Sequence, residues 1–435
     1  MKWLDKIDES GNNILITVGE KNKTTVWNRM SELYLIAEKY LIMKSLENNW
    51  FYKDLFLLEE LLERNVIKIL DYKCHNILEK LKNQPVDNKS FEHLSKLHYI
   101  NSYLMLQKNN YKGVAENYLA SSDYLTISFL KNILQHMTEI YYQKANDVEY
   151  QLSISEQLIE SIDFEKILSH LKSSNSENYY YILLPYLMCK FIKDPQKNIQ
   201  FYQEAVDIFI NKINNMALLD KNEYYFELIN FGIYIRNHYL LINIENIIFE
   251  LIKRKLKEGL DSELREKNFN LNRFVDYVII ALNVNKFKWV NDFINEYSPL
   301  LPPVYKDNEV NMVLAIIEFS KKNYKLTLKH LSNIKKSNET YYILCSKFFF
   351  KSNFLIGNYD ECFNELERLK KFSDKYKDSP FNTINTTPYL IRVYRSLLKF
   401  KSNQTKKNRK ELEFLINSEE NFSDKPWILE VMKDN

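Results

Sequence analysis

The chain has 435 residues, with 60 basic and 57 acidic side chains and a formal net charge of +3. This balance argues against a general nucleic-acid-binding or membrane-binding surface, because such surfaces need a concentrated excess of positive charge. Only six residues are glycine, and no two of them lie within five residues of each other. A conventional glycine-rich phosphate-binding loop is therefore excluded.

Residues 1–24 are predicted to be an irregular N-terminal lead-in or cap, with a β-branched run at 14–18 between two glycines. The segment begins with charged residues and has no apolar core of the length that a signal peptide needs. The longest nearly uncharged apolar run, 179–189, is far shorter than the roughly 20 residues that span a bilayer. We therefore expect a cytoplasmic protein without a membrane span.

Residues 25–88 are predicted to form an N-terminal helical region. Thr24 or Thr25 is a suitable N-cap residue. A second helix is expected from Tyr52 to about Leu81, because neither glycine nor proline interrupts this stretch before Pro85. In the first helix, apolar residues recur at the 3.6-residue period of an amphipathic helix, namely Val26, Met30, Leu33, Tyr34, Ala37, Tyr40 and Leu41.

Residues 89–265 are predicted to be degenerate helical repeats. A helix is expected at 93–106, and a polar turn followed by an aromatic residue comes after it, in the sequence QKNNYKGV. Further amphipathic helices are expected, including 200–213 and 223–239. Arg236 has no histidine six residues later, the spacing of one class of helical ribonuclease site, so we interpret it as a solvated or ion-paired helix residue.

Residues 266–435 contain the clearest repeat. Three times an apolar helix leads into a tight polar turn, an aromatic residue and a second amphipathic helix, with the aromatics Phe287, Tyr324 and Tyr359 spaced by 37 and 35 residues. This period is close to the 34 residues of a tetratricopeptide repeat. Here the chain resembles that family, in the turn aromatic and in the small or apolar residue three positions later. Those later residues are Val290, Thr327 and Cys362, and Ala315 and Pro302 also lie where the family places a small packing residue and a repeat-closing proline.

A fourth helix pair is expected over 388–400 and 410–416, followed by a short capping helix that opens at Pro426. The resemblance implies an all-α fold, a right-handed α-α superhelix of antiparallel helix pairs, in which the first helices line a concave groove. In its layout, a helical N-terminal region followed by such repeats, the chain also resembles bacterial peptide-receptor regulators of the Rap type.

The family's pattern places eight residues on the concave groove, namely Asn272, Asn283, Met312, Phe319, Lys347, Lys351, Phe354 and Lys401. We hypothesise that the three lysines, on neighbouring first helices, receive a carboxylate or an acidic segment of a protein ligand. The alternative is that they are solvated lysines with no ligand. The basic cluster at 399–410 leaves a similar choice, between phosphate contacts and a solvated loop between helices.

No catalytic, metal-binding or cofactor-binding motif is present that would predict an enzyme. The four cysteines form no C-x-x-C pair and lie far apart, so we predict isolated buried thiols and neither disulfides nor metal ligands. The closest histidine pair, His93 and His98, diverges around a helix and does not converge on a metal.

Together these observations predict a non-catalytic scaffold or adaptor that binds a protein or peptide in the concave groove and needs no cofactor. The alternative is a signalling regulator that senses a short peptide and changes its superhelical pitch. A nucleic-acid-binding helical protein is the third hypothesis, and salt-dependent retention on heparin or RNA would favour it. The sequence does not predict the oligomeric state or the identity of the partner.

Overall fold

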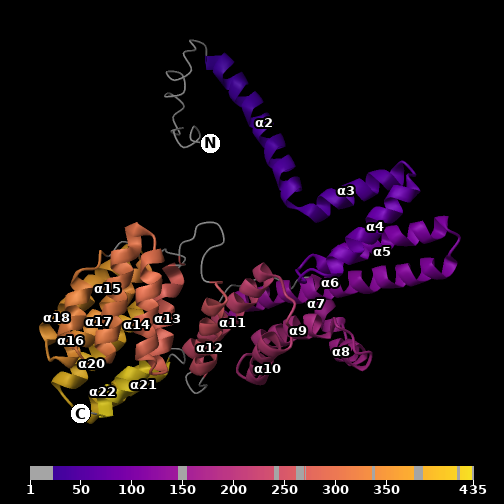
Figure 1. The fold of residues 1–435 in the computed structure, drawn as a ribbon. Coiled ribbons are helices and arrows are strands. Elements are labelled where there is room, and N and C mark those ends of the chain that lie inside the picture. The colour runs from indigo at the N-terminus through magenta and orange to yellow at the C-terminus, as the bar shows by residue number, and fades with distance from the viewer. Residues whose placement is uncertain are drawn as a thin grey trace. The chain divides into compact units, whose positions relative to one another are not determined.

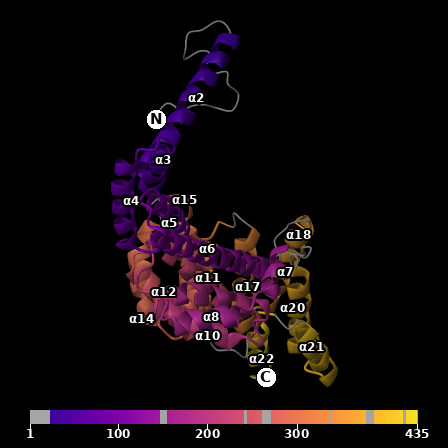
Figure 2. The ribbon, with the colours of Figure 1, turned by 90° about the vertical axis from the view of Figure 1, so that its right-hand side faces the viewer.

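The computed structural model describes residues 23–145, 154–239, 244–260, 269, 271–335, 339–376, 386–418 and 422–433. Helix follows helix along these segments, and no β-strand occurs in them (Figures 1 and 2). The predicted all-α class is confirmed, whereas the right-handed superhelix stays a prediction. The N-terminal lead-in predicted at 1–24 lies almost entirely outside the described residues.

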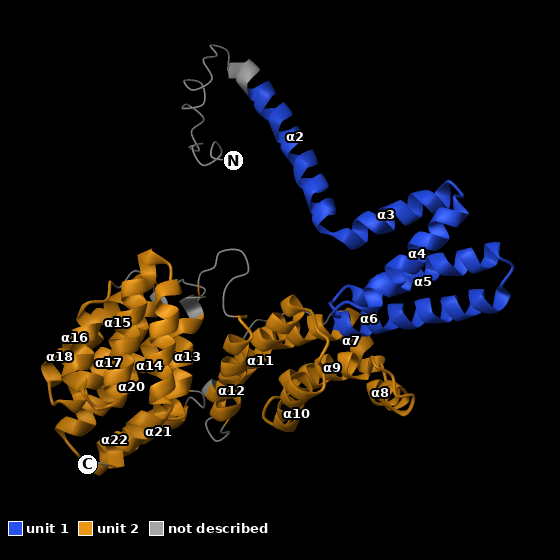
Figure 3. Cartoon of the chain, in the orientation of Figure 1, with its two compact units in different colours: residues 1–133 blue, residues 134–435 orange. Residues whose placement is uncertain are grey.

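Two compact units divide the chain, at residues 1–133 and 134–435 (Figure 3). The first unit contains five helices in its described part, of which the last continues into the second unit. They are α2 (Lys23–Asn48), α3 (Trp50–Glu63), α4 (Ile67–Lys82), α5 (Ser90–Gln107) and α6 (Tyr111–Ala145). Apolar residues of α3, α4 and α5 form one core, namely Phe51, Leu55, Leu58, Leu70, Cys74, Ile77, Leu97, Ile100 and Leu104.

The single helix predicted from Tyr52 to about Leu81 is wrong, because the chain turns between α3 and α4. Asn65 adopts a left-handed conformation with φ of 56°, which asparagine tolerates better than most residues. The Val66 N–H then donates to the Leu61 carbonyl at 2.9 Å and closes the end of α3. The turn lets α4 fold back so that Leu58 and Leu70 are buried in the same core.

The second unit begins with helices that pack mainly on their sequence neighbours, as α9 does on α10 and α11 on α12. The helices expected at 200–213 and 223–239 are present as α10 and α11, with ends that differ by one to five residues. The helices are α7 (Ile154–Ser161), α8 (Phe164–Ser173), α9 (Tyr179–Lys193), α10 (Ile199–Asn211), α11 (Leu218–His238) and α12 (Glu245–Lys257).

The remaining helices of the second unit form successive antiparallel pairs. First helices also pack on first helices, since α13 contacts α15 and α15 contacts α17. The elements are α13 (Leu271–Asn283), α14 (Phe287–Tyr297), η2 (Ser298–Leu300), α15 (Pro303–Ser320), α16 (Tyr324–Ser332), α17 (Glu339–Leu355), α18 (Tyr359–Lys375), α20 (Thr387–Ser402), α21 (Lys406–Ser418) and α22 (Lys425–Lys433).

The turns inside these pairs share one geometry. Phe287, Tyr324 and Tyr359 are each the first residue of a second helix. Two positions earlier the backbone is left-handed, at Asn285, Lys322 and Gly357. The backbone N–H of the residue that follows donates a Schellman-type hydrogen bond to the carbonyl five residues before it. The three donor–acceptor distances are 2.9, 2.8 and 2.9 Å. Because asparagine and even lysine adopt this conformation, the array needs few glycines.

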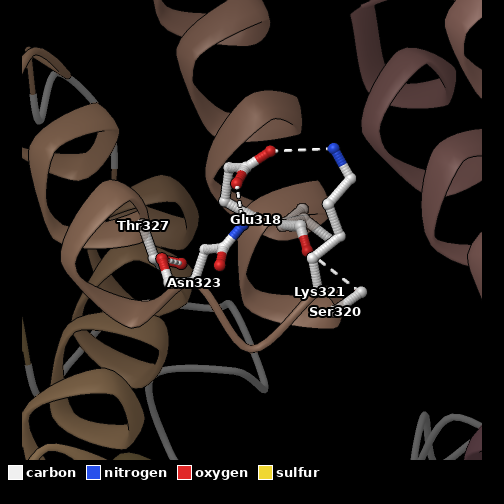
Figure 4. A network of polar contacts seen from close by, with 6 residues as sticks. Glu318, Ser320, Lys321, Asn323 and Thr327 are labelled. Atoms are coloured by element: carbon white, nitrogen blue, oxygen red, sulfur yellow. Dashed lines mark hydrogen bonds and ion pairs between the residues drawn. The ribbon is translucent and has the colours of Figure 1, made fainter.

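The turn between α15 and α16 shows how side chains fix this geometry (Figure 4). Asn323 donates from its side chain to Glu318 at 2.7 Å, and the Lys321 ammonium donates to the same carboxylate at 2.9 Å. The Thr327 hydroxyl donates back to the Asn323 carbonyl at 3.3 Å. The polar residues of the turn therefore satisfy one another, which leaves the apolar residues of α15 and α16 to pack between the helices.

His93 is a buried histidine whose neutral form the fold requires. Its ring in α5 is 6% exposed and stacks on Phe51 of α3, with centroids 3.5 Å apart, and its Nε2 has no hydrogen-bond partner. Burial lowers the pKa of His93 to about 4. In the unfolded chain this imidazole takes up a proton near pH 6.5, whereas in the folded chain it stays neutral down to about pH 4. The contribution of His93 to the free energy of unfolding is therefore fully present above pH 6.5 and is lost as the pH falls toward 4.

We expect the free energy of unfolding of the first unit to fall by about 2–3 kcal/mol more in wild type than in His93→Phe between pH 7 and pH 4.5. Phenylalanine keeps the stacked ring but removes the titrating group. Urea denaturation followed by circular dichroism at both pH values measures the difference. Parallel pH profiles for the two proteins would contradict the assignment.

Candidate functional site

Lys347 and Lys351 lie one turn apart on α17 and converge on one carboxylate. The Lys347 Nζ is 3.1 Å from Asp424 Oδ2, and the Lys351 Nζ is 2.7 Å from Asp424 Oδ1. Asp424 belongs to the same chain and immediately precedes α22. A carboxylate therefore does lie between these two lysines, but in this structure the chain itself supplies it.

Two hydroxyl groups complete the polar contacts. The Tyr394 hydroxyl of α20 donates to Asp424 Oδ2 at 2.7 Å, and the Lys347 ammonium donates to the Ser423 Oγ at 3.0 Å. The Asp424 side chain is only 6% exposed. Burial alone would raise its pKa, but the ammonium groups of Lys347 and Lys351 and the bonds from Lys351 and Tyr394 hold the pKa of Asp424 well below its ordinary value.

Aromatic rings surround the ion pair. Phe350 of α17 stacks on Tyr394 of α20, with centroids 4.1 Å apart. Trp427 of α22 presents its edge to Tyr394 at 6.0 Å and to Phe354 at 5.9 Å. The Lys351 ammonium lies 5.0 Å from the Trp427 ring centroid, within range of a cation–π interaction. The two lysines and these rings thus contact Asp424 and, three positions later, Trp427 of the same chain.

The terminal helix explains why the acid and the aromatic ring are held together. Ile428, Val431 and Met432 lie on one side of α22 at helical spacing and are buried in the core formed with α17, α18, α20 and α21. Asp424 is four residues before Ile428, and its carbonyl accepts the Ile428 N–H at 3.1 Å. Burial of this apolar side of α22 therefore positions Asp424 against the two lysines.

The three apolar residues predicted for the groove take part in packing between helices. Met312 is fully buried and lies 3.9 Å from the Cys345 thiol, and Phe354 is also buried. Phe319 is half-buried and contacts the rings of Phe348 and Tyr324. The structure thus places Met312 and Phe354 in the interior and not on an open groove, because the neighbouring helices cover these positions.

Asn283 and Lys401 are two further polar residues predicted for the groove. Asn283 is exposed at the end of α13 and donates to Glu245 of α12 at 2.7 Å. The side chain of Asn272 lies outside the described residues. Lys401 is half-buried in the last turn of α20. In the basic cluster, Lys399 and Arg409 form exposed ion pairs with Glu411 and Glu413 at 2.7 and 2.9 Å, and phosphate binding there stays a prediction.

A second polar cluster on neighbouring helices was not expected from the sequence. Arg273 of α13 donates to Asn230 of α11 at 2.6 Å. Glu309 of α15 is 8% exposed, and its pKa is raised to about 7 by burial and then by the nearby Asp276. These residues lie far apart in the sequence, and the contacts of α13 with α11 and with α15 bring them together.

The four cysteines are buried free thiols, namely Cys74, Cys189, Cys345 and Cys362, as predicted. Burial raises the pKa of Cys74, Cys189 and Cys362 to about 12, which disfavours the nucleophilic thiolate. Within the described segments, no group of three or more histidine, cysteine, aspartate or glutamate residues is placed to hold a metal ion. None of the helices there has both the length and the apolar character needed to cross a membrane.

Comparison with known proteins assigns no family. The chain matches no protein-family model, and comparisons with curated proteins and with solved structures give no match. The tetratricopeptide and Rap-type resemblances therefore depend on the residue pattern alone.

Proposed function

We propose that this chain is a non-catalytic protein-interaction scaffold of tetratricopeptide-like helix pairs. In this proposal the Lys347/Lys351 pair takes an acidic segment of a protein partner. The observation that carries the proposal is the convergence of two largely buried lysines and the Tyr394 hydroxyl on a single carboxylate. Such an arrangement selects an anionic side chain, because removal of that side chain leaves the ammonium groups without a counter-charge.

The partner's chemistry follows from the segment that now fills the site. Asp424 supplies the carboxylate, and Trp427 supplies an aromatic ring on the same side of a helix, against Phe354 and Tyr394. A partner segment with an acidic residue and an aromatic residue three positions later offers the same contacts. Such a segment competes with the chain's own C-terminal helix, so its apparent affinity is reduced by the stability of the α22 contact.

The second candidate is a peptide-sensing regulator, and the same observation favours it. A peptide that replaces Asp424 at the lysine pair releases α22 from its place in the core. The ligand thereby shifts the chain between an α22-bound and an α22-released state. The two candidates differ in outcome, because only a regulator changes its affinity for a second partner when the peptide displaces α22.

The test uses the full chain and a labelled peptide of residues 422–435. In fluorescence anisotropy, Asp424→Ala should bind this peptide at least about tenfold more tightly than wild type, because its own segment has lost the ion pair. Adding Lys351→Ala to this variant should abolish the gain. A peptide with its aspartate changed to asparagine should bind more weakly.

Two results would contradict the proposal. One is equal binding of the aspartate and asparagine peptides. The other is the copurification of one protein partner from native cells with both wild type and the Lys347→Glu/Lys351→Glu variant in equal amounts. Both candidates expect release of α22 on peptide binding, so a change in the affinity for a second partner on peptide binding would favour the regulator over the scaffold.

A further inference from the structure

The helix α2 exposes an unusual amount of apolar surface. It extends from α3 as a single long helix in both views (Figures 1 and 2). Nine large apolar side chains on it each leave more than half of their surface exposed, namely Trp27, Leu33, Tyr34, Leu35, Ile36, Tyr40, Leu41, Ile42 and Met43. A helix with this many apolar residues is normally covered, because exposing them to water is unfavourable.

Apolar residues occur around most of α2, on one wide side and on a narrow side nearly opposite to it, with Ile36 and Met43 between the two. At 100° per residue, the wide side is centred near Ala37 and also contains Leu33 and Leu41. Met30, Tyr34 and Tyr40 belong to it as well. Leu35 and Ile42 lie about 150° away from its centre. Residues 30, 33, 37 and 40 follow the alternating three- and four-residue spacing with which two helices pack side by side.

We propose that two copies of this chain associate through α2, whose wide apolar side packs antiparallel against the same side of α2 in the second copy. A two-fold contact of this kind needs a surface that is complementary to itself. An antiparallel pair centred on Ala37 meets this need, since Leu33 of one copy faces Leu41 of the other. The small side chain of Ala37 lets the two helices approach closely at the centre.

The exposed area is sufficient for a dimer. The nine side chains leave on the order of 1,000 Å² of apolar surface on each chain, if each exposes about 100 Å². A monomer rarely leaves a patch of more than about 300–600 Å² uncovered. Pairing of the wide sides, which carry four of the nine side chains together with Met30 and Ala37, would bury about 1,000 Å² in total, which is the lower limit for a specific interface.

The charges on α2 favour a second copy of the chain over a strongly charged partner. Its seven charged residues are Lys23, Arg29, Glu32, Glu38, Lys39, Lys44 and Glu47, four basic and three acidic, so two copies do not repel each other. Lys44 stands on the wide side opposite Met30 of the other copy. Its aliphatic stem can cover the methionine, while its ammonium turns toward Glu47, 3.8 Å away.

The mass of the full chain in solution tests this proposal. Light scattering during size exclusion, at roughly 1–50 µM, should give twice the 52.4 kDa of one chain. Leu33→Glu/Leu41→Glu places like charges opposite each other and should weaken association by about 100-fold or more. The control Leu35→Glu/Ile42→Glu changes equally exposed leucine and isoleucine residues on the narrow side and should remain a dimer.

A mixing experiment shows whether the glutamate variant has lost a specific pairing of two α2 helices or only non-specific hydrophobic association. Leu33→Lys/Leu41→Lys alone should be monomeric, but mixed in equal amounts with the glutamate variant it should restore the doubled mass, because opposite charges then face each other. Circular dichroism checks that all variants keep their helices. A monomeric wild type at about 50 µM, an equally dissociated narrow-side control, or a mixture that stays monomeric would each overturn the proposal.

Discussion

Replacing Asp424 with alanine should lower the free energy of unfolding of the second unit by about 3–5 kcal/mol. The substitution leaves the Lys351 ammonium, which is 12% exposed, without its counter-charge, and it removes the acceptor of the buried Tyr394 hydroxyl. Guanidinium denaturation, followed by tryptophan fluorescence and by circular dichroism, measures the loss. The pH dependence gives a second readout. Because the folded pKa of Asp424 is depressed, its contribution is present above about pH 4 and is lost as the pH falls further.

The matched control for Asp424 is an ion pair from the same region of the chain. Lys399 and Glu411 are 2.7 Å apart, but their side chains are 54% and 45% exposed. Glu411→Gln should therefore cost less than about 1 kcal/mol. If Asp424→Ala also costs less than this, the α22 ion pair does not anchor the C-terminal helix, and the competition on which the proposed function depends loses its basis.

Replacing Gly232 with alanine should lower the free energy of unfolding by about 2–4 kcal/mol. Gly232 lies inside α11, where helix propensity alone predicts a gain of about 1 kcal/mol for alanine. An added Cβ would, however, lie 2.5 Å from Ile248 Cγ1 of α12 and 2.7 Å from the Tyr202 hydroxyl of α10. That hydroxyl donates to the Leu228 carbonyl at 2.9 Å, so the added methyl group would also disturb a buried hydrogen bond.

A double-mutant cycle shows whether the close contact causes the loss. Ile248→Ala removes the nearest obstructing atoms, so the cost of Gly232→Ala should be smaller by about 1–2 kcal/mol in that background. Urea denaturation of the four proteins gives the coupling free energy. An alanine at 232 that stabilises the chain, or a cost that does not change in the Ile248→Ala background, would contradict the close packing of α11 and α12.

The repeat pattern predicted the helix pairs well because its signals are local. Phe287, Tyr324 and Tyr359 each begin a helix, and the polar residues before them form the turn. The break between α3 and α4 was missed because the left-handed residue there is Asn65, in a stretch without glycine or proline. Asparagine also takes the left-handed position of a turn at Asn109 and Asn285. This recurrence was a signal that could have located the turn between α3 and α4.

The candidate site was predicted only in part. Lys347 and Lys351 could be placed on one side of a helix from their spacing. Their counter-charge could not be predicted, because Asp424 lies 73 residues beyond Lys351 and no local rule connects the two. The sequence offered one hint, an aspartate just before the Pro426 and Trp427 that open the last helix.

The sequence by itself determined the helical class, the helix pairs and their turns, because amphipathic periodicity and left-handed turn residues act over a few neighbouring positions. Only the tertiary structure decided which lysines have a partner, which groove candidates are buried, and that Gly232 is held by its neighbours on α10 and α12. Those properties depend on which helices pack together, and that choice is made by contacts between residues far apart in the chain.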